Sequence, residues 1–422
     1  MVREKQGQES AVSVFLLSVT ACLIYAVSSG IRSNYGVMLN AISENSGVSY
    51  SSVSFVLALA QLVFGATQPI FGIISLKKSN RFVMCCGVLM MTVGLIAIPR
   101  CVSMWSLIVF LGVLLPAGTG AISFGIIMSA LASSLSQKSV STVSGFVNAS
   151  SGIGSSAFSP LLQALIAAVG LTVTMFFMSV PVILLLPASL WLCRTRSDAG
   201  RELSAPIEKE HIENMSDIKK MFVDALKSRA YQFLMIGFFT CGFHMAIIET
   251  HLYSQFVSYG FPERTAAYAF SIFGVAGIIG AILSGAACGR SEMRRVLGFL
   301  YGSRAVITLC FFMAPKTVPV IFAFAVFLGL TGNSTVTPTF GLVNKTFGAA
   351  KVATLLGFLF LCHQCGSFIS AWVGGVSASM TGTYTLIWTF DIFLCVLASA
   401  VSFSIKETVT RNVSNENFMK RS

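Results

Sequence analysis

Two arginines stand inside long apolar stretches of this 422-residue chain. Arg32 lies near the end of an apolar run over residues 12–36, and Arg304 lies in the middle of a run over 296–314. An arginine in hydrocarbon costs roughly 2.5–3.5 kcal/mol, so it normally has a partner or a function. Its planar guanidinium can donate two parallel hydrogen bonds to a carboxylate. Both residues therefore predict a site for a small organic anion. The alternatives are an interfacial position for Arg32, and a structural ion pair or a hydrogen bond to carbonyls of neighbouring helices for Arg304.

Polar residues that could complete such a site lie in the other half of the chain. His244 and Glu249 share the apolar run 231–257, and His363 with Gln364 interrupts the run 352–377. Histidine titrates near neutral pH and can donate to an anion. An acid inside a membrane protein can exchange a proton as its access to water alternates.

We expect these residues to act together with the arginines. The expected substrate-binding residues are Arg32, Tyr35, His244, Arg304, His363 and Gln364, and the expected proton-coupling residue is Glu249. Packing between helices is the alternative for each of the histidines. Asp391, another acid inside an apolar run, is interpreted as structural.

A faint internal repeat suggests which residues face each other. Gly72 and Gly285 each end an apolar run and precede a short basic turn, and they are 285 − 72 = 213 residues apart. The same offset carries Arg32 to position 245, beside His244. The repeat therefore predicts that His244 faces Arg32 across a central cavity. Two six-helix repeats with a site between them are a known transporter plan.

The composition is that of a chain embedded in lipid. Only 10% of residues are charged, against about 25% in a soluble domain, and the mean hydropathy is +0.81. Twelve apolar runs approach the roughly 20 residues that span a bilayer. The runs lie near residues 12–36, 53–74, 82–98, 104–128, 141–167 and 171–193, and near 231–257, 265–288, 296–314, 318–341, 352–377 and 384–405.

We therefore predict an all-α membrane protein with twelve transmembrane helices in two six-helix bundles. The bundles are expected at residues 1–193 and 231–422, and a cytoplasmic linker loop at 194–230 joins them. Eight of the 28 basic residues fall between Arg194 and Arg229. The periodicity near 215–227 allows a short helix against the inner leaflet.

The basic residues also predict the orientation. If the N-terminus is cytoplasmic, 23 basic residues fall on the cytoplasmic side and 3 on the other, as the positive-inside rule requires. Both termini are then cytoplasmic. The net charge of +12 is explained by loops facing an anionic leaflet, so no nucleic-acid partner is expected.

Other chemistries have weaker support. The 11 cysteines are scattered through apolar runs and read as small hydrophobes. The CHQC stretch from Cys362 has no second ligand pair near it, although zinc prefers four ligands, so no metal is expected. The chain lacks a G-x-x-x-x-G-K-[ST] phosphate-binding loop, which argues against an ATP-driven pump. No cofactor and no enzymatic activity are expected.

The stretch from Gly72 to Arg81, GIISLKKSNR, resembles the G-x-L-A-D-R-x-G-R-R pattern of the major facilitator superfamily. It keeps the first glycine and the basic positions, but Leu76 stands where the pattern has an aspartate. The resemblance covers essentially the whole chain, from the first apolar run to the last.

Within that superfamily the chain is most similar to the branch of monocarboxylate transporters and oxalate/formate antiporters. The similar stretches are RSNYGV from Arg32, CGFH from Cys241 with THL from Thr250, and HQCG from His363 with WVGG from Trp372. The branch often carries a charge in its eighth helix; here that run has none, and Arg304 lies in the ninth. The oxalate exchanger has a lysine in its eleventh helix, where this chain has His363 and Gln364, so oxalate is disfavoured as a substrate.

The resemblance implies a monomeric secondary transporter in the inner (plasma) membrane of a bacterial cell. We expect it to move a small organic anion, a monocarboxylate, by alternating access with proton symport or anion exchange. The alternative is proton-driven efflux of drug-like or metabolite molecules, for which Glu249 would also serve. A non-transporting membrane sensor is a weaker alternative.

Overall fold

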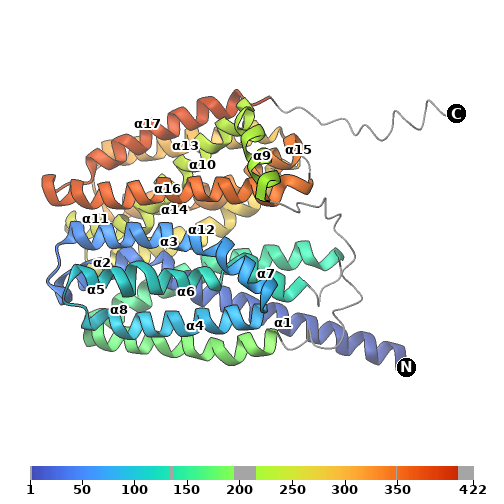
Figure 1. The fold of residues 1–422 in the computed structure, drawn as a ribbon. Helices are drawn as coiled ribbons and strands as arrows, with labels where there is room; N and C mark the ends of the chain where they lie inside the picture. The colour runs from blue at the N-terminus through green and yellow to red at the C-terminus, as the bar shows by residue number, and fades with distance from the viewer. Residues whose placement is uncertain (1, 133–136, 194–214, 348, 407–422) are drawn as a thin grey trace.

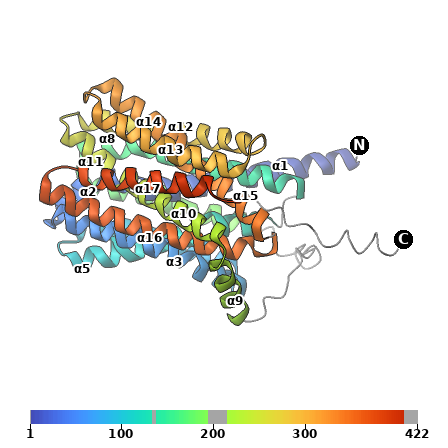
Figure 2. The same ribbon diagram turned by 90° about the horizontal axis from the view of Figure 1, so that it is seen from above.

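The described part of the protein is built from helices. The computed structural model describes residues 2–132, 137–193, 215–347 and 349–406, and no strand occurs among them. Figure 1 shows long helices running roughly antiparallel, with the first half of the chain below and the second half above. Figure 2 shows the same helices from above.

The first half of the chain forms the helices α1 to α8. Their bounds are α1 Val2–Ser33, α2 Tyr35–Ser46, α3 Tyr50–Lys77, α4 Asn80–Ala97, η1 Ile98–Arg100, α5 Met104–Leu107, η2 Ile108–Leu114, α6 Leu115–Ala121, α7 Phe124–Ala132 and α8 Gln137–Leu192. The segment η1 is a 3₁₀ turn, and η2 is a π-helix within an otherwise continuous apolar helix.

The second half forms α9 to α17. Their bounds are α9 Met215–Leu226, α10 Arg229–Ile247, η4 Ile248–Leu252, α11 Tyr253–Ser258, α12 Glu263–Cys288, α13 Met293–Met313, α14 Val318–Gly332, η5 Asn333–Thr335, α15 Val336–Phe347, α16 Ala349–Thr381 and α17 Thr385–Phe403. Here η4 is π-helical and η5 is a 3₁₀ turn.

The number of membrane crossings agrees with the prediction of twelve. In the described residues, 11 helical stretches are long and apolar enough to span a bilayer. One of them covers 48 residues, Gly145–Leu192, which is too long for a single crossing. Gly170 interrupts it with φ 73°, a left-handed conformation that glycine adopts without steric cost. This stretch therefore accounts for two crossings.

Several spanning helices are interrupted where polar side chains lie. The first crossing breaks at Asn34, whose side-chain amide donates to the carbonyls of Gly30 and Ser155 at 2.7 and 3.2 Å. The seventh changes to a π-helix at η4, which contains Glu249 and His251. In lipid, irregular backbone is tolerated where it is buried in protein or lines a cavity. The interruptions therefore mark the places at which a site can be built.

One end of the molecule, here called the distal end, lies opposite the start of α1 and the end of α17. It contains the end of α2, the start of α3, the end of α11 and the connection from α16 to α17. In Figure 1 the distal end lies at the left, and the start of α1 and the end of α17 lie toward the right.

The helix allowed by the periodicity near 215–227 is present as α9. Phe222 of α9 stacks on Phe358 of α16, with ring centroids 3.9 Å apart, so α9 is fixed to the end of the molecule opposite the distal end. Residues 194–214 of the expected linker lie outside the described residues. The expected division into two bundles and a linker stays a prediction.

Candidate functional site

Arg32 lies in the last turn of α1, directly before the break at Asn34. Its guanidinium Nη1 donates to Gln61 Oε1 of α3 and to Glu249 Oε2 of η4, both at 3.2 Å. The Phe64 ring lies below it, with its centroid 4.7 Å from the guanidinium carbon. The side chain keeps 20% of its surface exposed. Arg32 is therefore a cation held within the molecule that still has access to open space.

Glu249 brings the second half of the chain to this arginine. Its carboxylate is 10% exposed and lies 217 residues away from Arg32 in sequence. The approach is close because α2 presents Gly36 to η4: a Cβ on Gly36 would lie 2.8 Å from the Glu249 carbonyl oxygen. Any larger side chain would push the two helices apart. The ion pair thus bridges the two halves of the chain at a glycine contact.

Tyr35 follows the break in the first crossing and is 1% exposed. Its hydroxyl has no hydrogen-bond partner among the described residues. A buried hydroxyl without a partner is uncommon and calls for a water or a ligand group. Tyr35 is therefore suited to donate to an anion that reaches Arg32, as its expected role requires.

Arg304 occupies a different place from Arg32. It lies on α13, is fully buried, and donates from Nη2 to the carbonyl oxygens of Thr331 and Gly332, both at 2.6 Å. These carbonyls end α14, where the chain changes to the 3₁₀ turn η5. The carbonyl end of a helix carries partial negative charge, which stabilises a cation. Arg304 Nε and Nη1 have no hydrogen-bond partner among the described residues, but the two carbonyl bonds of Nη2 favour the structural alternative for Arg304.

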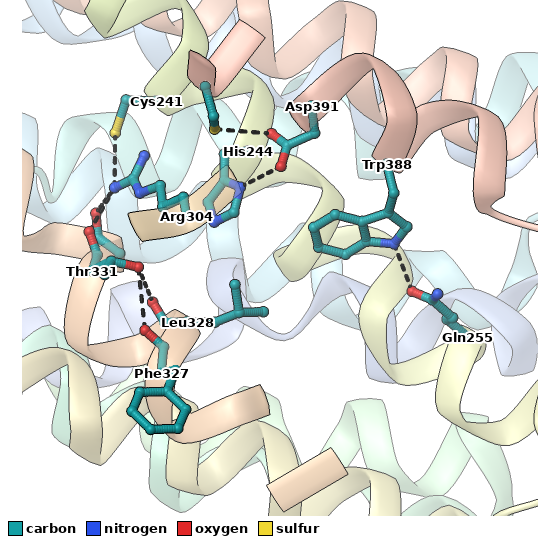
Figure 3. A network of polar contacts seen from close by, with 11 residues as sticks. Cys241, His244, Gln255, Arg304, Phe327, Leu328, Thr331, Trp388 and Asp391 are labelled. Carbon is teal, nitrogen blue, oxygen red and sulfur yellow. Dashed lines mark hydrogen bonds and ion pairs between the residues drawn. The ribbon is translucent and has the colours of Figure 1, made fainter. Parts of the chain in front are cut away.

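His244 bonds within its own half of the chain rather than with Arg32. Its Nδ1 lies 2.8 Å from Asp391 Oδ2 of α17, and both side chains are fully buried. Figure 3 shows this pair beside Arg304 and Cys241, with the four side chains gathered between helices of the second half. The repeat predicted that His244 lies opposite Arg32, but the residue of the second half that bonds to Arg32 is Glu249. Asp391, interpreted as structural from the sequence, is the partner of His244.

The same network offers three metal-ligand types. The ligand atoms of His244, Asp391 and Cys395 lie within 4.8 Å of one another. A closed zinc site takes four ligands. The cation Arg304 also lies near the cluster and interacts electrostatically with Cys395. We therefore interpret the cluster as a buried polar network that joins α10, α13 and α17.

His363 and Gln364 lie in the middle of α16. The Gln364 side chain packs on Gly65 of α3, and its Oε1 has no partner among the described residues. His363 is partly exposed, lies against the rings of Phe238 and Phe360, and reaches the thiol of Cys241. Gln364 thus lies where the two halves of the chain meet, and its amide is free to bind a polar group.

Taken together, the geometry separates two polar regions. Arg32, Glu249, Gln61 and Tyr35 form the first, between the two halves of the chain, and we call it the Arg32 site. The network around Arg304 and His244 forms the second, inside the second half. In the Arg32 site the arginine already binds the carboxylate of Glu249, so another carboxylate could bind it in place of Glu249.

A family model described as Major Facilitator Superfamily matches residues 21–371, and a further match covers residues 254–420. The chain belongs to the Major Facilitator Superfamily. This membership confirms the expected superfamily and the all-helical membrane fold, and it points to a membrane transporter rather than an enzyme. The narrower resemblance to the monocarboxylate and oxalate/formate branch stays a prediction.

This superfamily member is also similar to a curated protein, the uncharacterized MFS-type transporter YcxA of Bacillus subtilis (strain 168). The two are 28% identical over 188 residues, which cover 42% of this chain and 44% of the relative. The match thus spans less than half of the relative's length. The name of this relative specifies no substrate.

Three residues that form hydrogen bonds at the Arg32 site or at the distal end were not predicted from the sequence. Gln61 accepts from Arg32, and Tyr50 and Tyr384 bond across the distal end, yet none of them is charged. Polar uncharged residues are common in apolar helices and give no signal by themselves. Gln61 could have been predicted as a site residue, because a glutamine inside a lipid-embedded run needs a hydrogen-bond partner.

Proposed function

We propose that this protein is a secondary active transporter of a small organic anion, a monocarboxylate, working by alternating access. The observation that carries the proposal is the Arg32 site: an arginine with 20% of its surface exposed, held 3.2 Å from a carboxylate of the other half of the chain. An arginine that binds one carboxylate can bind another in the same geometry. The substrate carboxylate would take the place of Glu249.

This exchange gives a route to proton coupling. When the substrate carboxylate binds Arg32, Glu249 loses the cation that balances its charge. A charge left buried without a partner is strongly destabilising, so Glu249 then takes up a proton. Binding of the anion and binding of the proton therefore support each other, which is the requirement for symport. In the absence of a proton, one anion can displace another, which gives exchange.

The other expected site residues have different roles in the proposal: some contact the substrate, and others stabilise the second half of the chain. Tyr35 has a free hydroxyl near the break in the first crossing, and Gln364 has a free Oε1 at the meeting of the two halves; both suit a second contact to the substrate. We propose a lining role for His363 as well. For Arg304 and His244, full burial and existing bonds support a role in holding the second half together.

The positive-inside rule supports a placement in a plasma membrane with both termini cytoplasmic. The distal end then faces the outside. The described bonds between the two halves at this end join Tyr50 to His251 and to Tyr384. The structure is therefore best interpreted as an outward-closed state of the transport cycle.

The test is counterflow in proteoliposomes with a panel of labelled small carboxylates at two pH values. We expect saturable exchange of at least one monocarboxylate by the wild type, lost in Arg32→Gln at equal protein level. Arg264→Gln serves as the control, because Arg264 is an exposed arginine of α12 that bonds to Tyr268. Exchange that persists in Arg32→Gln would remove Arg32 from the substrate site.

Proton-driven efflux of drug-like or metabolite molecules is the second candidate. It is favoured by the ion pair of Arg32 and Glu249, in which the two charges neutralise each other beside the Phe64 ring. Such a site presents little net charge to a neutral or cationic molecule. A wild-type protein that exchanges no carboxylate in the panel, but moves neutral or cationic amphiphiles, would support efflux. Binding of a ligand without any flux would instead support a membrane sensor.

A further inference from the structure

We propose that His251 is a proton-binding site that controls closure of the distal end. His251, Tyr50 and Tyr384 form a hydrogen-bonded chain between the two halves of the molecule, here called the distal gate. Tyr50 is the first-half member, from the start of α3, while His251 lies on η4 and Tyr384 caps the start of α17. The proposal goes beyond the Arg32 site because the side-chain hydrogen bonds of these three residues involve neither Arg32 nor Glu249.

The bonds of the distal gate are short and continuous. The Tyr50 hydroxyl lies 2.9 Å from His251 Nδ1 and 2.8 Å from the Tyr384 hydroxyl. On the other side of the ring, His251 Nε2 lies 2.8 Å from the carbonyl oxygen of Ala371 on α16. The imidazole is fully buried. Both ring nitrogens of His251 are thus hydrogen-bonded. Of the three gate residues, Tyr50 alone belongs to the first half of the molecule.

The partners determine the protonation state of the ring. A carbonyl oxygen can only accept, so His251 Nε2 must carry a hydrogen and donate it to Ala371. In the neutral imidazole Nδ1 then has no hydrogen and accepts from the Tyr50 hydroxyl. Tyr50 in turn accepts from Tyr384. Every member of the distal gate is satisfied when His251 is neutral.

A proton at His251 changes this balance. It would place a net charge in a fully buried contact between the two halves. The groups that face the ring are uncharged: Tyr50 from α3, Tyr384 from the start of α17, and the Ala371 carbonyl and Gly374 from α16. The acid of its own segment, Glu249, is paired with Arg32. A buried cation without a counter-charge is costly, so protonation favours a separated gate in which water reaches the ring.

The structure also provides a path for the proton. A cavity of about 290 Å³ lies at the distal end and is lined by Tyr50, Tyr384, Ser254 and Asn40 among others. A proton from water in this cavity binds the Tyr384 oxygen, whose own hydrogen passes to the Tyr50 oxygen. The Tyr50 hydrogen then passes to His251 Nδ1. The two hydroxyls are regenerated, and the net result is one proton moved from the cavity to the imidazole.

The proposal rests on the alternating-access transport proposed above, but its test needs neither substrate nor flux. The distance between the two halves at the distal end is measured by electron spin resonance in lipid nanodiscs. Spin labels are attached to unnatural keto amino acids at positions 102 and 380, so the native cysteines remain. Val102 and Met380 are 78% and 80% exposed and lie in the first and second halves at this end.

The expected result is a shift to longer distances on acidification. An imidazole in water is half-protonated near pH 6.5, so the ratio of open to closed gates should rise about tenfold between pH 7.5 and pH 5.5. In His251→Gln, which can still donate to the Ala371 carbonyl but cannot titrate, the ratio should not change with pH. An unchanged wild-type distribution, or an equal shift in His251→Gln, would overturn the proposal while leaving carboxylate exchange untouched.

A second variant tests the gate without touching the histidine. Tyr50→Phe removes the hydroxyl that joins the two halves and should raise the open-to-closed ratio at pH 7.5 about fivefold, the factor for a hydrogen bond of about 1 kcal/mol. Tyr268→Phe is the matched control, because the Tyr268 hydroxyl bonds to Arg264 on the same helix. Equal ratios in Tyr50→Phe and Tyr268→Phe would also overturn the proposal.

Discussion

Replacing Arg304 by methionine should destabilise the protein rather than only abolish transport. The guanidinium makes two bonds of 2.6 Å to the Thr331 and Gly332 carbonyls at the end of α14. Hydrogen bonds from a charged donor contribute about 1.5–3 kcal/mol each, and part of this is offset by relieving the burial of the charge. We therefore expect a net loss of about 3 kcal/mol. The melting temperature should fall by roughly 3–4 °C, because a chain of 422 residues has a large entropy of unfolding.

The assay is thermal unfolding of the purified protein in nanodiscs, together with the protein level in the membrane. Arg304→Lys keeps the charge but not the forked donor geometry, so we expect an intermediate loss of stability. Arg264→Met is the control, because that arginine is exposed on α12. A stable, well-expressed Arg304→Met protein that has lost carboxylate exchange would refute the structural role and return Arg304 to the substrate site.

Three further substitutions test the site and the contacts around it. Glu249→Gln removes the proton acceptor of the Arg32 site, so carboxylate exchange should persist with a weaker dependence on pH, the remainder coming from His251; an unchanged pH profile in counterflow would exclude Glu249 as the proton carrier. Gly36→Val places side-chain atoms within about 3 Å of the Glu249 backbone and should cost about 1–3 kcal/mol, seen as a lower melting temperature and slower counterflow than in Gly285→Val, because Gly285 is an exposed helical glycine whose added Cβ would meet no atom within 4 Å. Asp391→Asn leaves His244 without its acid and should destabilise by about 3 kcal/mol; wild-type thermal stability would contradict the structural interpretation.

Most of the fold could be predicted from the sequence because lipid imposes a strong pattern. The helix expected at 82–98 is observed as α4 Asn80–Ala97, and the one expected at 384–405 is observed as α17 Thr385–Phe403. Hydropathy gives no signal for the interruptions. The break at Asn34 depends on a contact with the Ser155 carbonyl, 121 residues away, and such contacts are not encoded in any local window.

The site was only partly predictable for a related reason. The sequence singled out Arg32 and Glu249 separately, but the repeat placed His244 opposite Arg32. Glu249 lies five positions after His244, a step that would turn two side chains about 140° apart on an α-helix, and the π-helix η4 begins between them. His244 therefore faces Asp391 within its own half while Glu249 faces Arg32. A repeat offset predicts how far along its helix a residue lies. It does not predict which face of the helix contacts the other half of the chain.

The central claim is that the substrate carboxylate displaces Glu249 from Arg32. The most direct measurement is calorimetric titration of the wild-type protein with the exchanged carboxylate in two buffers of different ionisation enthalpy, which counts the protons taken up on binding. The account predicts an uptake approaching one proton per anion near neutral pH, and none in Glu249→Gln. Binding without proton uptake, or with equal uptake by both proteins, would contradict it.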